Sequence, residues 1–304
     1  MTDNNLFASG ITGSENKTET SEVSIKDISG NDSGSSITVD CPKDIIERRA
    51  DITYSKVMHF TYFSKTCGME RGANILMPAG LKEGKKYPVV YMLHGIFGDE
   101  NSFTGDPANG MQTIWANMVA DGLSREVIVV FPNMFAKTKE DETPGFSAEA
   151  CLPYDNFVND WADDLMPYVE ANYPVLKGRE NTALAGFSMG GRETLYISLL
   201  RPDLMSCSCA ISPAPGLVPG KDRFMTHPGS LREEEVSYQD GVEQPDILLL
   251  CGTNDSIVGD FPKSYHDLMD KNGVKHTWYE VPEADHDNRT ILSGVYNFMR
   301  NKIA

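Results

Sequence analysis

The 304-residue chain has few basic residues, few cysteines and no long apolar run. Lys and Arg number 27 against 44 Asp and Glu, which gives a net charge of −17. Because binding to nucleic-acid phosphates or to anionic membrane surfaces needs clustered Lys and Arg, this balance argues against both partners. No stretch approaches the roughly 18 apolar residues that span a bilayer, so we expect no membrane partner.

The cysteines predict neither a disulfide framework nor a metal centre. Six cysteines are too few to scaffold a chain of this size. Cys207 and Cys209 alternate along an apolar segment, so both should face one side of a buried strand. A zinc site would need a second close pair, which the sequence lacks. We therefore expect no metal and no cofactor.

The start of the chain differs in composition from the rest. Residues 1–46 are acidic and rich in Ser, Thr, Asn and Gly, which predicts a flexible tail or linker before a single domain at 47–304. The alternation in SEVSIKDIS and SSITVD leaves an edge strand open. The first residues, MTDNNLFASG, lack the basic and apolar parts of a signal peptide. The chain as written is thus expected in the cytoplasm, and a secreted location would require a signal that had been removed.

Strands and helices alternate from about residue 51 onward. Continuous apolar runs such as YPVVYML and ILLLC are typical of strands covered on both faces. The pattern predicts an α/β fold with a mostly parallel eight-stranded sheet and helices on both faces. The expected strands are Lys56–Lys65, Gly72–Met77, Tyr87–Leu93, Val127–Phe131, Thr182–Phe187, Cys207–Ile211, Ile247–Cys251 and His276–Val281; the expected helices are Asn109–Asp121, Tyr154–Asn172, Gly190–Leu200, Phe261–Lys271 and Asn288–Lys302. Segments Ala136–Cys151 and Pro215–Pro245 lack the pattern and are expected to be loop insertions.

The strongest local motif is Gly-Phe-Ser-Met-Gly at 186–190, which fits the G-x-S-x-G nucleophile elbow. The apolar strand TALAGF precedes it and the helical segment GRETLYISLL follows it, as the elbow requires. A sharp turn there would raise the Ser188 hydroxyl above the sheet edge and aim a helix N-terminus at the same place. We predict that Ser188 is a nucleophile.

A serine nucleophile needs a base, and His286 is the histidine that we expect to supply it. In this architecture the partners follow the nucleophile in the order acid, then histidine. His286 lies in the loop EADHDN between the last strand and the last helix, at the same sheet edge as the elbow. The other histidines either precede Ser188 or have structural explanations in a helix, a strand or an irregular segment: His59, His94, His227, His266 and His276.

The acid of the triad should follow the strand Ile247–Cys251. The loop GTNDSIVGD places Asp255 there, where its carboxylate would orient the imidazole of the base. Asp260 on the same loop is a weaker rival. Asp285 and Asp287 flank the histidine, but adjacent residues rarely point at each other's ring.

The oxyanion hole needs two preset N–H donors. One should be the backbone N–H of Met189, directly after the nucleophile. The other should come from the loop LHGIFGDENSF, where the N–H of Ile96 is the expected donor. His94 in this loop is expected to have a packing or hydrogen-bonding role.

Taken together, these motifs resemble a known family. The strings YPVVYMLHGIFGDENSF, NFVNDWADDLMPYVEANYPV, ALAGFSMGGRETL, ISPAPG and CGTNDS, with the late His286, are similar to the feruloyl esterases of carbohydrate esterase family one, within the esterase-D-like α/β-hydrolases. The resemblance covers about Ile52 to the C-terminus. It implies an eight-stranded α/β-hydrolase sheet without a cofactor, with Ser188, Asp255 and His286 as the triad and Met189 and Ile96 at the oxyanion positions.

The resemblance also implies a substrate. The expected reaction is hydrolysis of feruloyl (hydroxycinnamoyl) esters on plant cell-wall xylan or its oligosaccharides, with neighbouring domains or a homodimer as further possible partners. An acetyl xylan esterase or other small-acyl esterase is the alternative, because the segment AKTKEDETPGFSAEACLPYD differs from the shorter family stretch and leaves the acyl group open. An S-formylglutathione hydrolase is a further option. A catalytically inactive carbohydrate-binding protein is the alternative from another class, which the intact triad argues against.

Overall fold

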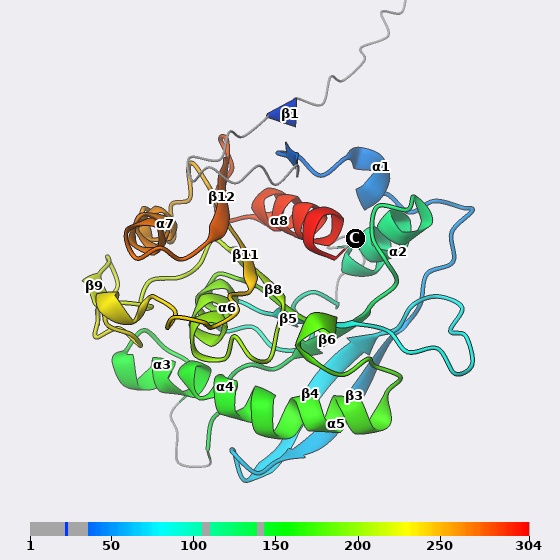
Figure 1. Ribbon diagram of the computed structural model, residues 1–304, viewed down its shortest axis with the longest axis horizontal. Helices are drawn as coiled ribbons and strands as arrows, with labels where there is room; N and C mark the ends of the chain where they lie inside the picture. The colour runs from blue at the N-terminus through cyan, green and yellow to red at the C-terminus, as the bar shows by residue number, and fades with distance from the viewer. Residues whose placement is uncertain (1–21, 24–35, 105–109, 139–142, 304) are drawn as a thin grey trace, which may run out of the picture.

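The computed structural model describes residues 22–23, 36–104, 110–138 and 143–303 (Figure 1). Within these ranges, eight strands form one sheet in the order β12-β11-β8-β7-β5-β6-β4-β3. Only β4 runs antiparallel to its neighbours, and all other pairs in this sheet are parallel. The predicted eight-stranded, mostly parallel sheet is therefore confirmed. The strands are β3 (Val57–Ser64), β4 (Met69–Leu76), β5 (Val89–Leu93), β6 (Ile128–Pro132), β7 (Thr182–Phe187), β8 (Cys207–Ile211), β11 (Asp246–Gly252) and β12 (His276–Val281).

Helices cover both faces of this sheet, as Figure 1 shows. One face packs against α1 (Lys43–Ile46), α2 (Met111–Ala120) and α8 (Asn288–Lys302). The other face packs against α3 (Ala148–Asp155), α4 (Phe157–Asp160), a π-helical turn (Trp161–Leu165), α5 (Met166–Asn172), α6 (Met189–Leu200) and α7 (Phe261–Lys271). Every residue of β5, β6 and β8 is buried, in agreement with the continuous apolar runs of β5 and β6. No helix in the described part of the chain has the length and apolar character to cross a membrane.

The remaining elements are short. β1 (Glu22–Val23) pairs with β2 (Ile37–Thr38), and β9 (Gly220–Lys221) pairs with β10 (Thr226–His227). Two 3-10 turns occupy Arg179–Asn181 and Glu233–Glu235. The six cysteines are free, and Cys207 and Cys209 both lie on the α8 side of β8, as expected.

The helix expected at Tyr154–Asn172 begins earlier and is not uniform. It starts with α3 at Ala148, inside the segment that the sequence predicts as a loop. Ser147 caps this helix, because its hydroxyl oxygen accepts a hydrogen bond from the Ala150 N–H at 3.1 Å. The π-helical turn then shifts the register at Trp161. The apolar spacing alone could not show either feature.

The end of the predicted tail packs on the domain. Ile37, Val39 and Ile45 are buried in the core beneath α2 and α8. Asn297 of α8 accepts a hydrogen bond from the Thr38 N–H at 3.0 Å and donates one to the Thr38 carbonyl at 2.8 Å. Residues 36–46 therefore share the core of the predicted domain, although their composition resembles that of a linker.

We expect Ile45→Ala to destabilise the protein by about 2–5 kcal/mol, because it removes a fully buried side chain and leaves a cavity. The measurement is the free energy of unfolding in urea. Ile46→Ala, at the neighbouring half-buried position, is the matched control and should cost clearly less. Equal effects of the two substitutions would contradict the packing of this segment.

Candidate active site

The sequence-predicted site residues all follow strands at one edge of the sheet. Ile96 follows β5, Ser188 follows β7, Asp255 follows β11 and His286 follows β12. These four strands are parallel, so their carboxyl ends lie at the same edge. The topology thus brings together residues that are separated by up to 190 positions in the sequence.

Ser188 occupies a strained turn between β7 and α6. Its φ of 59° and ψ of −117° are unusual for a residue with a side chain. A Cβ atom on Gly186 would lie 2.2 Å from the Gly190 carbonyl oxygen, and one on Gly190 would lie 2.3 Å from the Leu93 oxygen. Both flanking glycines are therefore required by the close approach of backbone, which is the geometry of a nucleophile elbow.

His286 and Asp255 are in direct contact. The His286 Nδ1 and Asp255 Oδ2 atoms lie 2.8 Å apart. The other carboxylate oxygen, Oδ1, accepts hydrogen bonds from the Ile257 and Val258 N–H groups at 3.1 and 3.0 Å. Burial acts to raise the pKa of Asp255, but the bonds from His286 and Val258 outweigh it and hold the pKa below its usual value. An ionised Asp255 fixes His286 with its Nδ1 as the donor, which leaves Nε2 to act as a base.

The rival acids have other partners. Asp285 accepts hydrogen bonds from the Ser256 N–H and from the backbone N–H of His286, both at 2.8 Å. Asp287 is the N-cap of α8 and accepts from the Arg289 and Thr290 N–H groups. Asp260 precedes α7 at its N-cap position. Among the described residues, only Asp255 bonds to the His286 ring.

The His286 ring lies at the end of β7 that leads into Ser188. Its centroid lies 4.3 Å from that of Phe187, the residue directly before Ser188. The structure therefore places the His286–Asp255 pair beside the elbow. This arrangement can accept a proton from a serine hydroxyl and hold the resulting positive charge against a carboxylate.

Two backbone amides at this edge are free to bind an anion. Among the described residues, the N–H groups of Ile96 and Met189 have no hydrogen-bond acceptor. The neighbouring Phe97 N–H is occupied by the Tyr154 hydroxyl at 3.2 Å. A Cβ on Gly95 would lie 3.5 Å from the Ser188 Cβ, so the loop that holds Ile96 lies directly against Ser188. Two such donors at a helix N-terminus and a tight loop can stabilise an oxyanion.

His94 holds this loop in place through the hydrogen bonds of its ring. Its Nδ1 lies 2.7 Å from the Gly95 carbonyl oxygen, and its Nε2 accepts the Met134 N–H at 3.0 Å. Burial lowers the pKa of His94, which keeps the ring neutral and able to accept at Nε2. The expected hydrogen-bonding role of His94 is thus confirmed.

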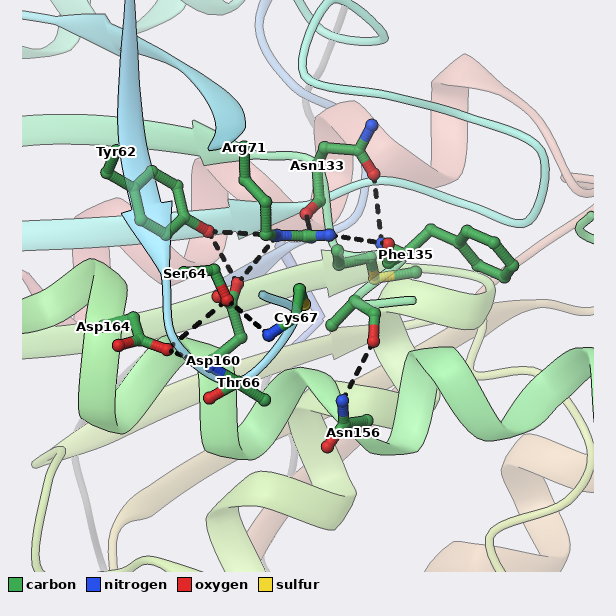
Figure 2. Close-up of polar contacts among 12 residues, drawn as sticks. Tyr62, Ser64, Thr66, Cys67, Arg71, Asn133, Phe135, Asn156, Asp160 and Asp164 are labelled. Carbon is green, nitrogen blue, oxygen red and sulfur yellow. Dashed lines mark hydrogen bonds and ion pairs between the residues drawn. The ribbon is translucent and has the colours of Figure 1, made fainter. Parts of the chain in front are cut away.

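His94 bonds to the loop after β6 through the Met134 N–H. A buried polar network, shown in Figure 2, holds the same loop. Arg71 donates to the carbonyl oxygens of Asn133 and Phe135 and pairs with Asp160 at 3.1 Å. The Tyr62 hydroxyl donates to the same carboxylate at 2.6 Å. Figure 2 also shows Asp164, one helical turn after Asp160, accepting hydrogen bonds from Ser64 and from the Thr66 N–H.

Sequence reasoning missed this support. A faint signal exists in β4, where Arg71 shares the buried face with Ala73 and Ile75. Asp160 and Asp164 have the four-residue spacing of one helix face. Neither signal indicates that Arg71 contacts Asp160, because this contact joins β4 to a helix about 90 residues away in the sequence.

Exposed aromatic rings lie at and beside the loop that holds Ile96. Phe97, Phe146 and Phe224 are 55%, 51% and 44% exposed. Phe146 contacts both others, edge-on to Phe97 at 5.2 Å and stacked on Phe224 at 4.8 Å between centroids. We call these three residues the aromatic surface. A cavity of about 360 Å³ lies nearby, between the β9–β10 segment and the Asp255 loop.

Comparison with known families identifies one match over most of the chain. The family model described as "Putative esterase" matches residues 64–287. A curated relative, an endo-1,4-beta-xylanase/feruloyl esterase of Xylanibacter ruminicola, is 30% identical over 167 residues. That match covers 53% of this chain but only 22% of the relative, so the chain spans a small part of that longer protein.

Solved structures agree with the family match. A CE1 ferulic acid esterase from Anaeromyces mucronatus, solved with ferulic acid, is 42% identical, with a TM-score of 0.83 over 87% of this chain and 96% of that one. An S-formylglutathione hydrolase from Agrobacterium tumefaciens, 16% identical with a TM-score of 0.63 over 85% of this chain and 99% of that one, shares the fold. The predicted α/β-hydrolase fold and family resemblance are thereby confirmed.

Proposed function

Since this chain belongs to that esterase family and is a carboxylic ester hydrolase, we propose that it releases ferulic acid from feruloylated plant cell-wall xylan or its oligosaccharides. The observation that carries this proposal is the 42% identity to a ferulic acid esterase over 96% of that protein. The name of the Xylanibacter relative, which joins xylanase and feruloyl esterase, supports xylan as the polymer.

The proposed chemistry uses Ser188, His286 and Asp255 as a triad. His286 takes the proton of the Ser188 hydroxyl as the oxygen attacks the ester carbonyl. The tetrahedral oxyanion is bound by the N–H groups of Met189 and Ile96. The sugar alcohol leaves with the proton from His286, which gives an acyl-enzyme. His286 then activates a water that attacks the acyl carbonyl, and ferulic acid and free Ser188 result.

The aromatic surface favours a hydroxycinnamoyl group over an acetyl group. Phe97 directly follows Ile96, so the rings of this surface begin next to a proposed oxyanion donor. A planar aromatic acyl chain can stack on such rings, and each aromatic contact is worth about 0.5–1.5 kcal/mol. An acetyl group has no ring that could stack on them. We therefore place the hydroxycinnamoyl chain along the aromatic surface.

The test is hydrolysis of methyl ferulate and of p-nitrophenyl acetate by wild-type and Phe146→Ala protein. We expect efficient ferulate release by the wild type. The substitution should lower kcat/KM for methyl ferulate about tenfold, since about 1.4 kcal/mol of contact energy is lost, and leave acetate release nearly unchanged. Phe63→Ala is the matched control, because Phe63 is equally exposed but lies on β3.

The outcomes separate the alternatives. Acetate release without ferulate release would favour a small-acyl or acetyl xylan esterase. Equal losses for both substrates would show that Phe146 supports the site without binding the acyl group. If neither ester were hydrolysed, the result would favour the alternative of a catalytically inactive carbohydrate-binding protein.

A further inference from the structure

Two histidines from separate elements lie together at the amino end of β12, the opposite end of this strand from His286. His266 lies in α7 and His276 is the first residue of β12. The His266 Nδ1 and His276 Nε2 atoms are 2.8 Å apart. Asp270, one helical turn after His266, approaches both rings: its Oδ2 lies 3.7 Å from His266 Nε2, and its Oδ1 lies 3.9 Å from His276 Nε2. The ligand atoms of the three side chains fall within 4.8 Å of one another.

The surroundings orient both rings for coordination. The His276 Nδ1–H donates a hydrogen bond to the Val274 carbonyl oxygen at 2.8 Å. His276 Nε2 therefore carries a lone pair, which points into the cluster and accepts a hydrogen bond from His266 Nδ1–H. A metal ion bound at this nitrogen replaces that hydrogen bond. His266 is stacked on Trp278, with centroids 5.0 Å apart and planes at 5°. A carbonyl that accepts from the second ring nitrogen is the usual support of a histidine ligand, and the Trp278 ring fixes the plane of His266.

The spacing of these atoms suits a first-row metal ion. Ligand atoms around a tetrahedral Zn²⁺, with bonds of about 2.0–2.2 Å, lie about 3.3–3.5 Å from each other. The 2.8 Å contact uses His266 Nδ1, whereas the 3.7 Å contact uses His266 Nε2, and a single ion binds only one nitrogen of this ring. One ligand atom from each of the three side chains lies within 4.8 Å of the other two, so shifts of about 1 Å bring the three atoms to the spacing around Zn²⁺. The Asp270 side chain is 55% exposed, so an ion can enter from solvent.

We propose that His266, His276 and Asp270 bind one divalent transition-metal ion, Zn²⁺ in particular. Two imidazoles and a carboxylate are a ligand set that Zn²⁺ accepts, with water in the fourth position. The ion joins the C-terminal half of α7 to the start of β12, which is an edge strand of the sheet. It acts as a structural link between helix and strand.

The site is separate from the proposed catalytic site. His276 begins β12, whereas His286 follows its end at Val281, and the strand alone spans about 17 Å between these ends. Metal binding is therefore expected to change stability and to leave ester hydrolysis unchanged. The acidic chain, with its net charge of −17, also favours cation binding over anion binding.

The experiment is calorimetric titration of the full chain, freed of metal with a chelator, with ZnCl₂ at pH 7.5. We expect one saturable site and a rise of several degrees in the unfolding temperature with excess zinc. His266→Gln and Asp270→Asn should each weaken binding at least about tenfold. Asp270 is exposed, so the second variant keeps the fold. His59→Gln is the matched control, because His59 lies on β3, where it bonds to Asn74. The His59→Gln protein should bind zinc with the affinity of the wild type.

Three results would overturn the proposal. The first is the absence of saturable binding in the wild type. The second is unchanged affinity in both His266→Gln and Asp270→Asn. The third is inhibition of p-nitrophenyl acetate hydrolysis with the same midpoint as binding, which would place the ion at His286.

Discussion

Ser188→Ala is expected to lower kcat for ester hydrolysis by about 10⁴–10⁶-fold while the protein stays folded. Without the hydroxyl no acyl-enzyme forms, and only binding and the oxyanion donors still assist water. The fold should survive, because alanine is smaller than serine and the turn is held by backbone contacts: the Ser188 N–H donates to the Ile211 carbonyl at 2.9 Å, and the Ser188 carbonyl accepts from Arg192 and Ala214.

The measurement is the initial rate with methyl ferulate, together with near-ultraviolet circular dichroism to verify the fold. Ser256→Ala is the control, since this serine lies at the same sheet edge on the Asp255 loop and its hydroxyl bonds to Asp285. It should retain most of the activity. A Ser188→Ala protein with more than about one percent of wild-type turnover would refute the nucleophile assignment, given the loss expected when such a serine is removed.

Asp255→Asn should reduce kcat by about 10⁴-fold with a much smaller change in KM. The amide cannot stabilise the imidazolium, and it favours the wrong tautomer of His286 by donating where the carboxylate accepts. The Ile257 and Val258 N–H groups can still bond to the amide oxygen, so the loop should keep its shape.

Asp287→Asn and Asp285→Asn are the matched controls for this assignment. Asn is as good an N-cap as Asp, so α8 should remain intact in the first variant. Both controls should retain activity within about tenfold, because neither side chain bonds to the His286 ring. If Asp287→Asn were slower than Asp255→Asn, the acid would be wrongly assigned.

Local sequence patterns were sufficient to predict the sheet and to select the residues of the proposed triad. Buried strands such as β5 appear in the sequence as unbroken apolar runs. The glycines on either side of Ser188 indicate a sharp turn, because a side chain at either position would overlap the backbone. Asp255 and His286 could be chosen because each follows a parallel strand. The parallel order of the strands, which the alternation predicts, then brings their loops together.

Contacts between distant elements could not be predicted in this way. Arg71 meets Asp160 only because β4 lies beside the helical layer, and no sequence spacing encodes that approach. His266 and His276 each have an ordinary local explanation, and their 2.8 Å contact depends on how α7 packs against β12. The early start of α3 depends on a single capping serine, Ser147, within a polar segment.

Steric exclusion requires glycine at positions 186 and 190, whereas the proposed chemistry requires serine at position 188. A Cβ atom at 186 or 190 would overlap main-chain atoms regardless of what the protein does. A descendant that lost its chemistry but kept its backbone would retain both glycines and be free to replace the serine. The glycine spacing thus reflects the shape of the turn, and position 188 is where loss or retention of the proposed activity can be seen.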